Sequence, residues 1–171
     1  MSLIKKSLTK QRECGDCNLC CKLPYMDSGF WEKSNTHVFK GEYEWCKHCE
    51  IGVGCKIYSK RPSACRDFYC LYQAGMTDLK PNKNGFFMYL EREESTEQKV
   101  ITIMCEEHRL DSIPKLIMND PDGYMLVDQG WAFHIRYNSN DNDLAIFDLK
   151  LFGMELKKVK RNIPFQEQIN A

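Results

Sequence analysis

The chain has 171 residues, a formal net charge of zero and 43% apolar side chains, enough for one domain whose core needs no cross-links. No apolar run approaches the roughly 20 residues that span a bilayer, which excludes a membrane-embedded helix. The N-terminal stretch lacks the apolar segment of a secretory signal. We therefore expect a cytoplasmic protein without a membrane partner, in which thiols stay reduced.

Cysteine is the residue type that stands out, because nine of the ten cysteines fall within residues 14–70. Reduced thiols at this density predict metal binding rather than a disulfide framework. The predicted metal ligands are Cys14, Cys17, Cys20, Cys21, Cys46, Cys49, Cys55, Cys65 and Cys70.

In chain order the sequence divides into four regions: an N-terminal arm (1–13), a cysteine-cluster metal-binding region (14–78), an antiparallel β-rich region (79–153) and a C-terminal tail (154–171). The spacing of Cys17, Cys20 and Cys21 predicts a short helix that starts near Asp16. Aromatic-rich residues 24–45 predict a loop with short strands.

A second helix is predicted from Pro62 at its first position to Gly75 at its end. On a continuous helix Cys65 and Cys70 would lie about 140° apart. Either the helix deforms between them, or the two thiols serve different purposes.

The second half predicts strands, at 86–90, 100–104 and 144–149, with a short helix at 112–118. Residues 123–127 and 131–137 predict a β-hairpin. We expect a frayed tail from Met154. The predicted fold class is α+β: a small single domain with a metal-stapled N-terminal half of short helices and loops packed on an antiparallel sheet.

Two Cys-x-x-Cys pairs, Cys14 with Cys17 and Cys46 with Cys49, suit a tetrahedral ion, because both sulfurs of such a pair reach one zinc at about 2.3 Å. Adjacent Cys20 and Cys21 would point about 100° apart on a helix, which predicts that they do not share one ion. The nine thiols allow two four-ligand sites with one left over, or one site with several structural thiols.

Iron–sulfur binding is the main alternative to one or two zinc ions. Residues 14–20 read Cys-x-x-Cys-x-x-Cys, the three-ligand run of a cubane cluster, which needs one remote fourth cysteine. No cysteine here is followed by proline, unlike the ferredoxin pattern. Outside the cluster, Cys105 and His108 form a Cys-x-x-His, although a buried structural thiol is the commoner role of such a cysteine.

Charge is uneven along the chain. Residues 1–80 carry 13 Lys/Arg and 9 Asp/Glu, whereas residues 81–171 carry 11 and 15. A basic half permits a zinc-dependent nucleic-acid-binding module, but cations that compensate anionic thiolates explain the surplus better. Arg61 and Arg66 either donate to thiolates or a bound anion, or pair with Asp67, Glu50 or backbone carbonyls.

The order Cys14-x-x-Cys17-x-x-Cys20-Cys21 followed by Cys55-x-Ile57-Tyr58-x-x-Arg61-Pro62-x-x-Cys65-Arg66-x-Phe68-x-Cys70 resembles the YkgJ-like cysteine-cluster family. This resemblance covers residues 14–70 and implies zinc or iron chelation. The pair Cys46 and Cys49 departs from the family pattern, where one cysteine is expected. A distant similarity to the cysteine-rich region of flagellin lysine methylase implies an iron–sulfur enzyme.

The sequence therefore predicts a metal-binding protein that chelates zinc or iron through its cysteine cluster. The metal is expected to be mainly structural, in an accessory module with an unidentified protein partner. No catalytic motif is present, and closed four-sulfur coordination leaves no open position for water. An iron–sulfur protein with redox or modification activity is the first alternative, and a nucleic-acid-binding module is the second.

Overall fold

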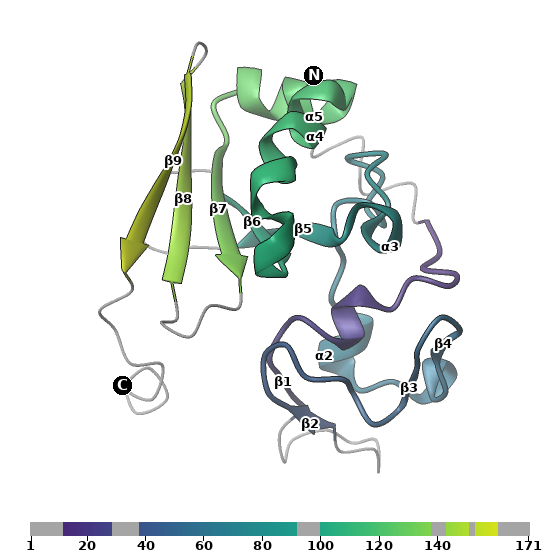
Figure 1. The fold of residues 1–171 in the computed structure, drawn as a ribbon. Helices are drawn as coiled ribbons and strands as arrows, with labels where there is room; N and C mark the ends of the chain where they lie inside the picture. The colour runs from purple at the N-terminus through teal and green to yellow at the C-terminus, as the bar shows by residue number, and fades with distance from the viewer. Residues whose placement is uncertain (1–11, 29–37, 92–99, 138–142, 151–152, 161–171) are drawn as a thin grey trace.

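The computed structural model describes residues 12–28, 38–91, 100–137, 143–150 and 153–160. Figure 1 shows a cysteine-rich half of short elements beside a sheet with its helices. The short elements are η1 (Leu19–Cys21), β1 (Met26–Asp27), β2 (Phe39–Lys40), β3 (Cys49–Glu50), β4 (Gly54–Cys55), η2 (Tyr58–Lys60) and α2 (Ser63–Arg66). Two antiparallel pairs, β1 with β2 and β3 with β4, form the strands of this half.

The other half is a five-stranded sheet of order β5-β6-β7-β8-β9. Its strands are β5 (Phe86–Glu91), β6 (Val100–Cys105), β7 (Ala132–Tyr137), β8 (Asp143–Lys150) and β9 (Gly153–Lys160). Helix α3 (Pro81–Asn84) precedes β5, and η3 (Glu107–Ser112), α4 (Ile113–Asn119) and α5 (Pro121–Asp128) connect β6 to β7. The predicted α+β fold class of a small single domain is confirmed.

One strand pair departs from the prediction of an antiparallel sheet, because β6 and β7 run parallel. Parallel neighbours need a crossover that returns the chain to the same end of the sheet, usually through a helix. The segment η3-α4-α5 provides that crossover, so the predicted hairpin of 123–127 with 131–137 is wrong. The predicted strands at 86–90, 100–104 and 144–149 and the helix at 112–118 are confirmed.

Residues 123–127 are helical because a strong helix start precedes them. Asp120 is the N-cap of α5, and its Oδ2 accepts a hydrogen bond from the Gly123 backbone N–H at 2.9 Å. Pro121 occupies the first helical position, where its missing N–H costs nothing. The prediction of a frayed tail from Met154 is also wrong for residues 154–160, which belong to β9 and pair with β8. Residues 1–11 of the predicted arm and 161–171 lie outside the described residues.

Both helices predicted in the cysteine region are shorter than expected. The first is only the 3₁₀ turn η1, and α2 ends at Arg66 instead of continuing to Gly75. Beyond α2 the chain turns repeatedly, with the Met76 backbone N–H donating to the Leu71 carbonyl. The helix therefore ends between Cys65 and Cys70, so the two thiols do not lie on one continuous helix.

Strand β6 is buried along its whole length because both faces of the sheet are covered there. On one face, residues of α4 and α5 such as Ile117 and Leu126 pack with Ile101, Ile103 and Phe133. On the other face a second cluster joins the two halves of the protein: Leu23, Cys70, Phe87 and Met104. The cysteine region thus packs against this face of the sheet.

No helix in the described part of the chain is long and apolar enough to cross a membrane.

Replacing Asp120 by alanine is expected to destabilise the fold by about 2–3 kcal/mol, because it removes the N-cap and leaves two buried donors without an acceptor. One donor is the Gly123 N–H, and the other is the Thr77 hydroxyl, 2.7 Å from Oδ2. Urea unfolding measures the change. Asp128→Ala, in the last turn of α5, is the matched control with an expected change within about 0.5 kcal/mol. Equal stability of the two variants would contradict this role of Asp120.

Candidate metal centre

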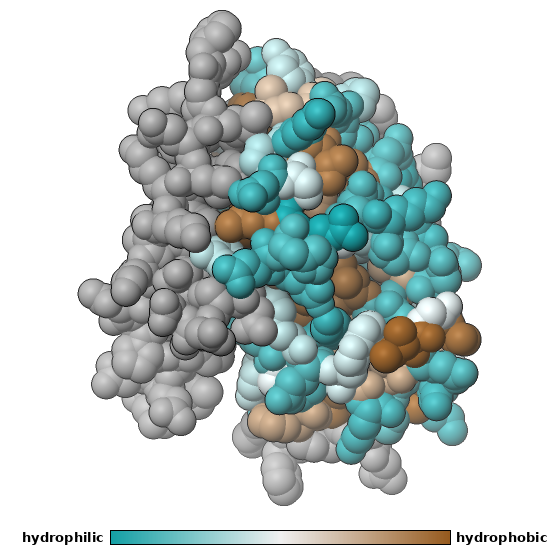
Figure 2. Space-filling model, in the orientation of Figure 1, coloured by the Kyte–Doolittle hydropathy of each residue, from teal (hydrophilic) through white to brown (hydrophobic). Residues whose placement is uncertain are grey.

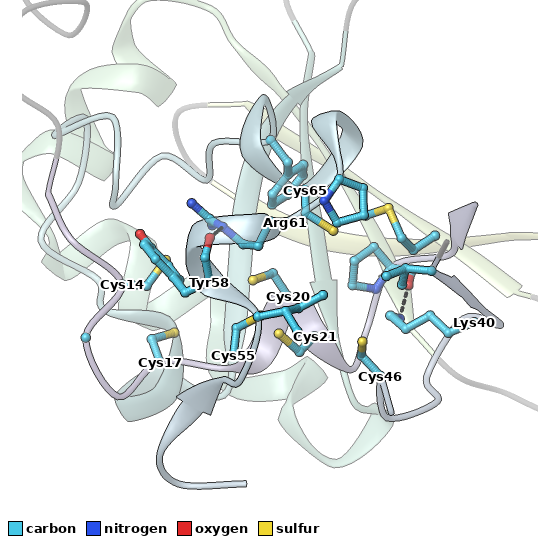
Figure 3. A pocket seen from close by; sticks show the side chains of 17 residues that line it. Cys14, Cys17, Cys20, Cys21, Lys40, Cys46, Cys55, Tyr58, Arg61 and Cys65 are labelled. Atoms are coloured by element: carbon cyan, nitrogen blue, oxygen red, sulfur yellow. Dashed lines mark hydrogen bonds between the residues drawn. The ribbon is translucent and has the colours of Figure 1, made fainter. Parts of the chain in front are cut away.

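Seven cysteines from three separate stretches of chain line one hollow in the cysteine region, here called the large hollow (Figure 3). They are Cys14, Cys17, Cys20, Cys21, Cys46, Cys55 and Cys65. Lys40, Tyr58 and Arg61 also line it. In Figure 3 the side chains of Cys20, Cys21 and Cys55 gather in the middle of the view, with Cys14 and Cys17 on one side and Cys46 and Cys65 on the other. The structure therefore brings together most of the predicted ligands.

Backbone turns bring these stretches together. The Cys17 N–H donates to the Cys14 carbonyl at 3.0 Å, and Gly15 between them adopts a positive φ of 56°, which glycine tolerates without strain. The Cys49 N–H donates to the Cys46 carbonyl at 2.9 Å. Both Cys-x-x-Cys pairs are thus closed turns, as a metal-binding knuckle requires. The Cys46 N–H also bonds the Cys21 carbonyl at 2.9 Å, which ties the second stretch to the first.

Cys49 is the one predicted ligand that lines neither this hollow nor the smaller one described below, but it lies next to the cluster. It pairs directly with Cys55 across the β3–β4 hairpin, and its thiol forms a hydrogen bond with Cys21. Cys21 in turn forms a hydrogen bond with Cys20. The angle between these adjacent thiols was derived from a helix, and the structure has a 3₁₀ turn there instead. That Cys20 and Cys21 do not share one ion stays a prediction.

The crowded thiols are harder to ionise than free cysteines. Burial raises the pKa of Cys14 from 9.0 to about 11, with Cys70 and Cys17 adding to the rise. Burial likewise raises the pKa of Cys65 to about 11 and that of Cys49 to about 12. The hydrogen bond with Cys20 raises the pKa of Cys21 well above its usual range. At neutral pH these groups are therefore thiols, and a bound cation would have to displace their protons.

Two basic side chains face the thiols of the large hollow. Lys40 is 4% exposed, and its ammonium donates to the carbonyls of Lys22, Pro24 and Gly41. Its charge acts on Cys46, Cys21 and Cys20. A buried ammonium is costly unless it is paired and hydrogen-bonded, and nearby thiolates would supply the missing negative charge. Nothing in the sequence pattern had indicated Lys40, because its burial depends on the loop around it.

Arg61 takes one of the two roles predicted for it, a hydrogen bond to a backbone carbonyl, and donation to a thiolate stays a prediction. Its Nε donates to the Tyr58 carbonyl at 2.9 Å, and its guanidinium stacks on the Tyr58 ring at 3.7 Å from the centroid. From this fixed position its charge lowers the pKa of Cys14, Cys55 and Cys65, although burial outweighs it at each. Arg66, in contrast, is exposed and lies outside the residues that line the hollow.

Cys70 and Cys105 do not line the large hollow. Cys70 lines a neighbouring small hollow together with Cys14, Cys17 and Cys20. Cys105 is fully buried in the core that contains α4 and α5, and burial raises its pKa to about 12. The side chain of His108 is 64% exposed and lies 3.5 Å from Glu106. Cys105 is therefore a structural thiol, and the Cys-x-x-His does not contribute to the cluster.

The residues present fit a thiophilic metal by their chemistry. All candidate donors are thiols, the ligands that zinc and iron–sulfur clusters select. Asn18, within the first cysteine run, has a buried amide nitrogen without a hydrogen-bond partner, although Asn18 lines neither hollow. Among residues 12–28, 38–91, 100–137, 143–150 and 153–160, no three His, Cys, Asp or Glu side chains are already arranged to hold one ion. Ligation would therefore require the thiols to turn toward a common centre.

No protein-family model, curated protein or solved structure matches this chain. The resemblance to the YkgJ-like family thus rests on the order and spacing of the cysteines and on the residues between them, such as Arg61-Pro62.

Proposed function

We propose that the protein binds zinc or iron through the cysteine cluster and that the metal serves mainly to hold the cysteine region in its fold. One observation carries the proposal: seven thiols from three stretches of chain surround a single hollow. The spacing of two Cys-x-x-Cys pairs and the YkgJ-like order of the cysteines support it.

The scarcity of other stabilising interactions in this region supports a structural role. Its longest helix has four residues and each of its strands has two. The β3–β4 hairpin has Ile51 65% exposed and Val53 66% exposed at its tip, and Figure 2 shows apolar surface at the right-hand edge, where the hairpin lies. The hairpin is thus not held by burial of its own apolar residues. In small domains with little core, metal-binding free energy becomes folding free energy.

Lys40 and Arg61 support an anionic site. Four thiolates around a divalent ion carry a formal charge of about −2. The two cations would offset that charge, and their hydrogen bonds to backbone carbonyls hold them in place. Thiolate sites characteristically depend on such surrounding donors. The metal would supply cross-links between stretches that are distant in sequence, and the sheet half would serve as their support.

Replacing Cys65 or Cys17 by alanine is expected to release the metal held by that thiol and to weaken the packing of the chain around it, because each removes one ligand. Elemental analysis of anaerobically purified protein measures the metal, and near-ultraviolet circular dichroism measures the packing of the aromatic side chains. Cys105→Ala is the matched control. It removes a more deeply buried thiol from the opposite face of the sheet. This variant should keep the metal and should cost about 1 kcal/mol of stability. Full metal retention in Cys65→Ala and Cys17→Ala would refute the assignment of these ligands.

Metal affinity is expected to rise with pH through the neutral range. Cys14, Cys49 and Cys65 have pKa values of about 11, 12 and 11, so each is protonated below those values and must lose its proton on binding. Affinity should increase about tenfold per pH unit for each proton displaced. Zinc titration against a competing chelator between about pH 6 and pH 8 measures the slope. A flat profile, after correction for the chelator, would mean that thiols are not the ligands.

A further inference from the structure

Four thiols line the small hollow, and three of them also line the large hollow. Cys14, Cys17 and Cys20 line the small hollow together with Cys70, and its other lining residues are Tyr72, Gln73, Pro81 and Phe87. Cys70 does not line the large hollow, and the four cysteines that line only the large hollow are Cys21, Cys46, Cys55 and Cys65. Since Cys49 contacts Cys21, the nine thiols form a set of four and a set of five.

The end of α2 separates the two sets. Cys65 lies within α2 and lines the large hollow. The helix ends at Arg66, and Cys70, in the chain beyond it, lines the small hollow. Cys70 is anchored there, because it is 7% exposed and packs with Leu23, Phe87 and Met104 against the sheet. Its position near Cys14 and Cys17 is therefore fixed by the core.

Gln73 lies between two of the four thiols. Its Nε2 donates to Cys14 Sγ at 2.9 Å, and its Oε1 accepts from the Cys70 thiol at 3.9 Å. The residue is 9% exposed, so its amide is largely withdrawn from water and directed to sulfur. A buried amide donor is the kind of partner that sulfur ligands of iron clusters use, and it tunes their reduction potential.

We propose that the small hollow is a second metal centre and holds a [4Fe–4S] cluster on Cys14, Cys17, Cys20 and Cys70, with Gln73 as a hydrogen-bond donor to its sulfur ligands. The inference rests on the proposed function, because it assigns the other five thiols to the first centre. Three cysteines at two-residue spacing plus one remote cysteine form the ligand pattern of a cubane cluster, and the structure identifies that remote cysteine as Cys70.

A single centre does not account for the arrangement. One tetrahedral ion takes four ligands and one cubane cluster takes four, whereas nine thiols converge here. The surroundings differ as well: Lys40 and Arg61 line only the large hollow, and the amide of Gln73 lines only the small one. Adjacent Cys20 and Cys21 join the two sets, so the two centres would be neighbours.

The test loads the full chain anaerobically with zinc and then with ferric iron, a thiol reductant and sulfide. It measures zinc, iron, acid-labile sulfide and visible charge-transfer absorbance. Wild-type protein is expected to hold zinc together with about four iron and four sulfide per chain. Cys70→Ser should lose iron, sulfide and colour but keep zinc. Cys65→Ser should lose zinc but keep the cluster, and Cys105→Ser should keep both.

Two results would overturn the inference while leaving the proposed function intact: zinc binding without any cluster, or parallel loss of both metals from Cys70→Ser and Cys65→Ser. Protein that binds neither metal would overturn the proposed function itself. Because Cys70 also packs in the core, Gln73→Leu provides an independent variant of similar size. It should keep zinc and iron but shift the cluster's reduction potential to a more negative value, and an unchanged potential would remove Gln73 from the site.

Discussion

The packing of nine thiols into a region with almost no core is the constraint on which the cysteine half depends. Burial and neighbouring thiols raise the pKa values of Cys14, Cys49 and Cys65, so these three cysteines are protonated at neutral pH. Two cations, Lys40 and Arg61, lie beside them. Lys40 is buried and has Glu44 as its nearby carboxylate, whereas Arg61 is partly exposed. Thiolates formed on binding of the proposed metal would add negative charge beside the buried ammonium of Lys40.

The sheet half gives this region its support. Phe87 and Met104 lie opposite each other on β5 and β6 and present one face to Leu23 and Cys70, while α4 and α5 cover the other face. Phe68 extends the contact, with its ring 5.7 Å from that of Phe87. The cysteine region, which has few apolar contacts of its own, therefore packs against the apolar core of the sheet half. Metal cross-links would stabilise the outer parts of that region, such as the β3–β4 hairpin, which the sheet does not reach.

Much of this arrangement was predictable from the sequence because it depends on local chemistry. Cysteine spacing indicated the two knuckles, and short runs of β-branched and aromatic residues indicated most of the strands. Asp120-Pro121 was an available helix-start signal, but the apolar residues that follow and Gly130 favoured a hairpin instead. The parallel pairing of β6 with β7 could not be predicted without that helix.

The division of the thiols between the two hollows could not be predicted either, because it depends on where α2 ends and on the tertiary packing of Cys70. Lys40 and Gln73 gave no signal, since their burial is a property of the fold.

X-ray absorption spectroscopy of the metal-loaded protein tests the central claim most directly, because it reports which atoms surround the metal. Ligation by the cysteine cluster predicts a first shell made of sulfur alone, with zinc–sulfur distances of about 2.3 Å in zinc-loaded protein. A first shell dominated by nitrogen or oxygen, or bound metal that survives in the Cys17→Ala and Cys65→Ala variants with an unchanged spectrum, would contradict it.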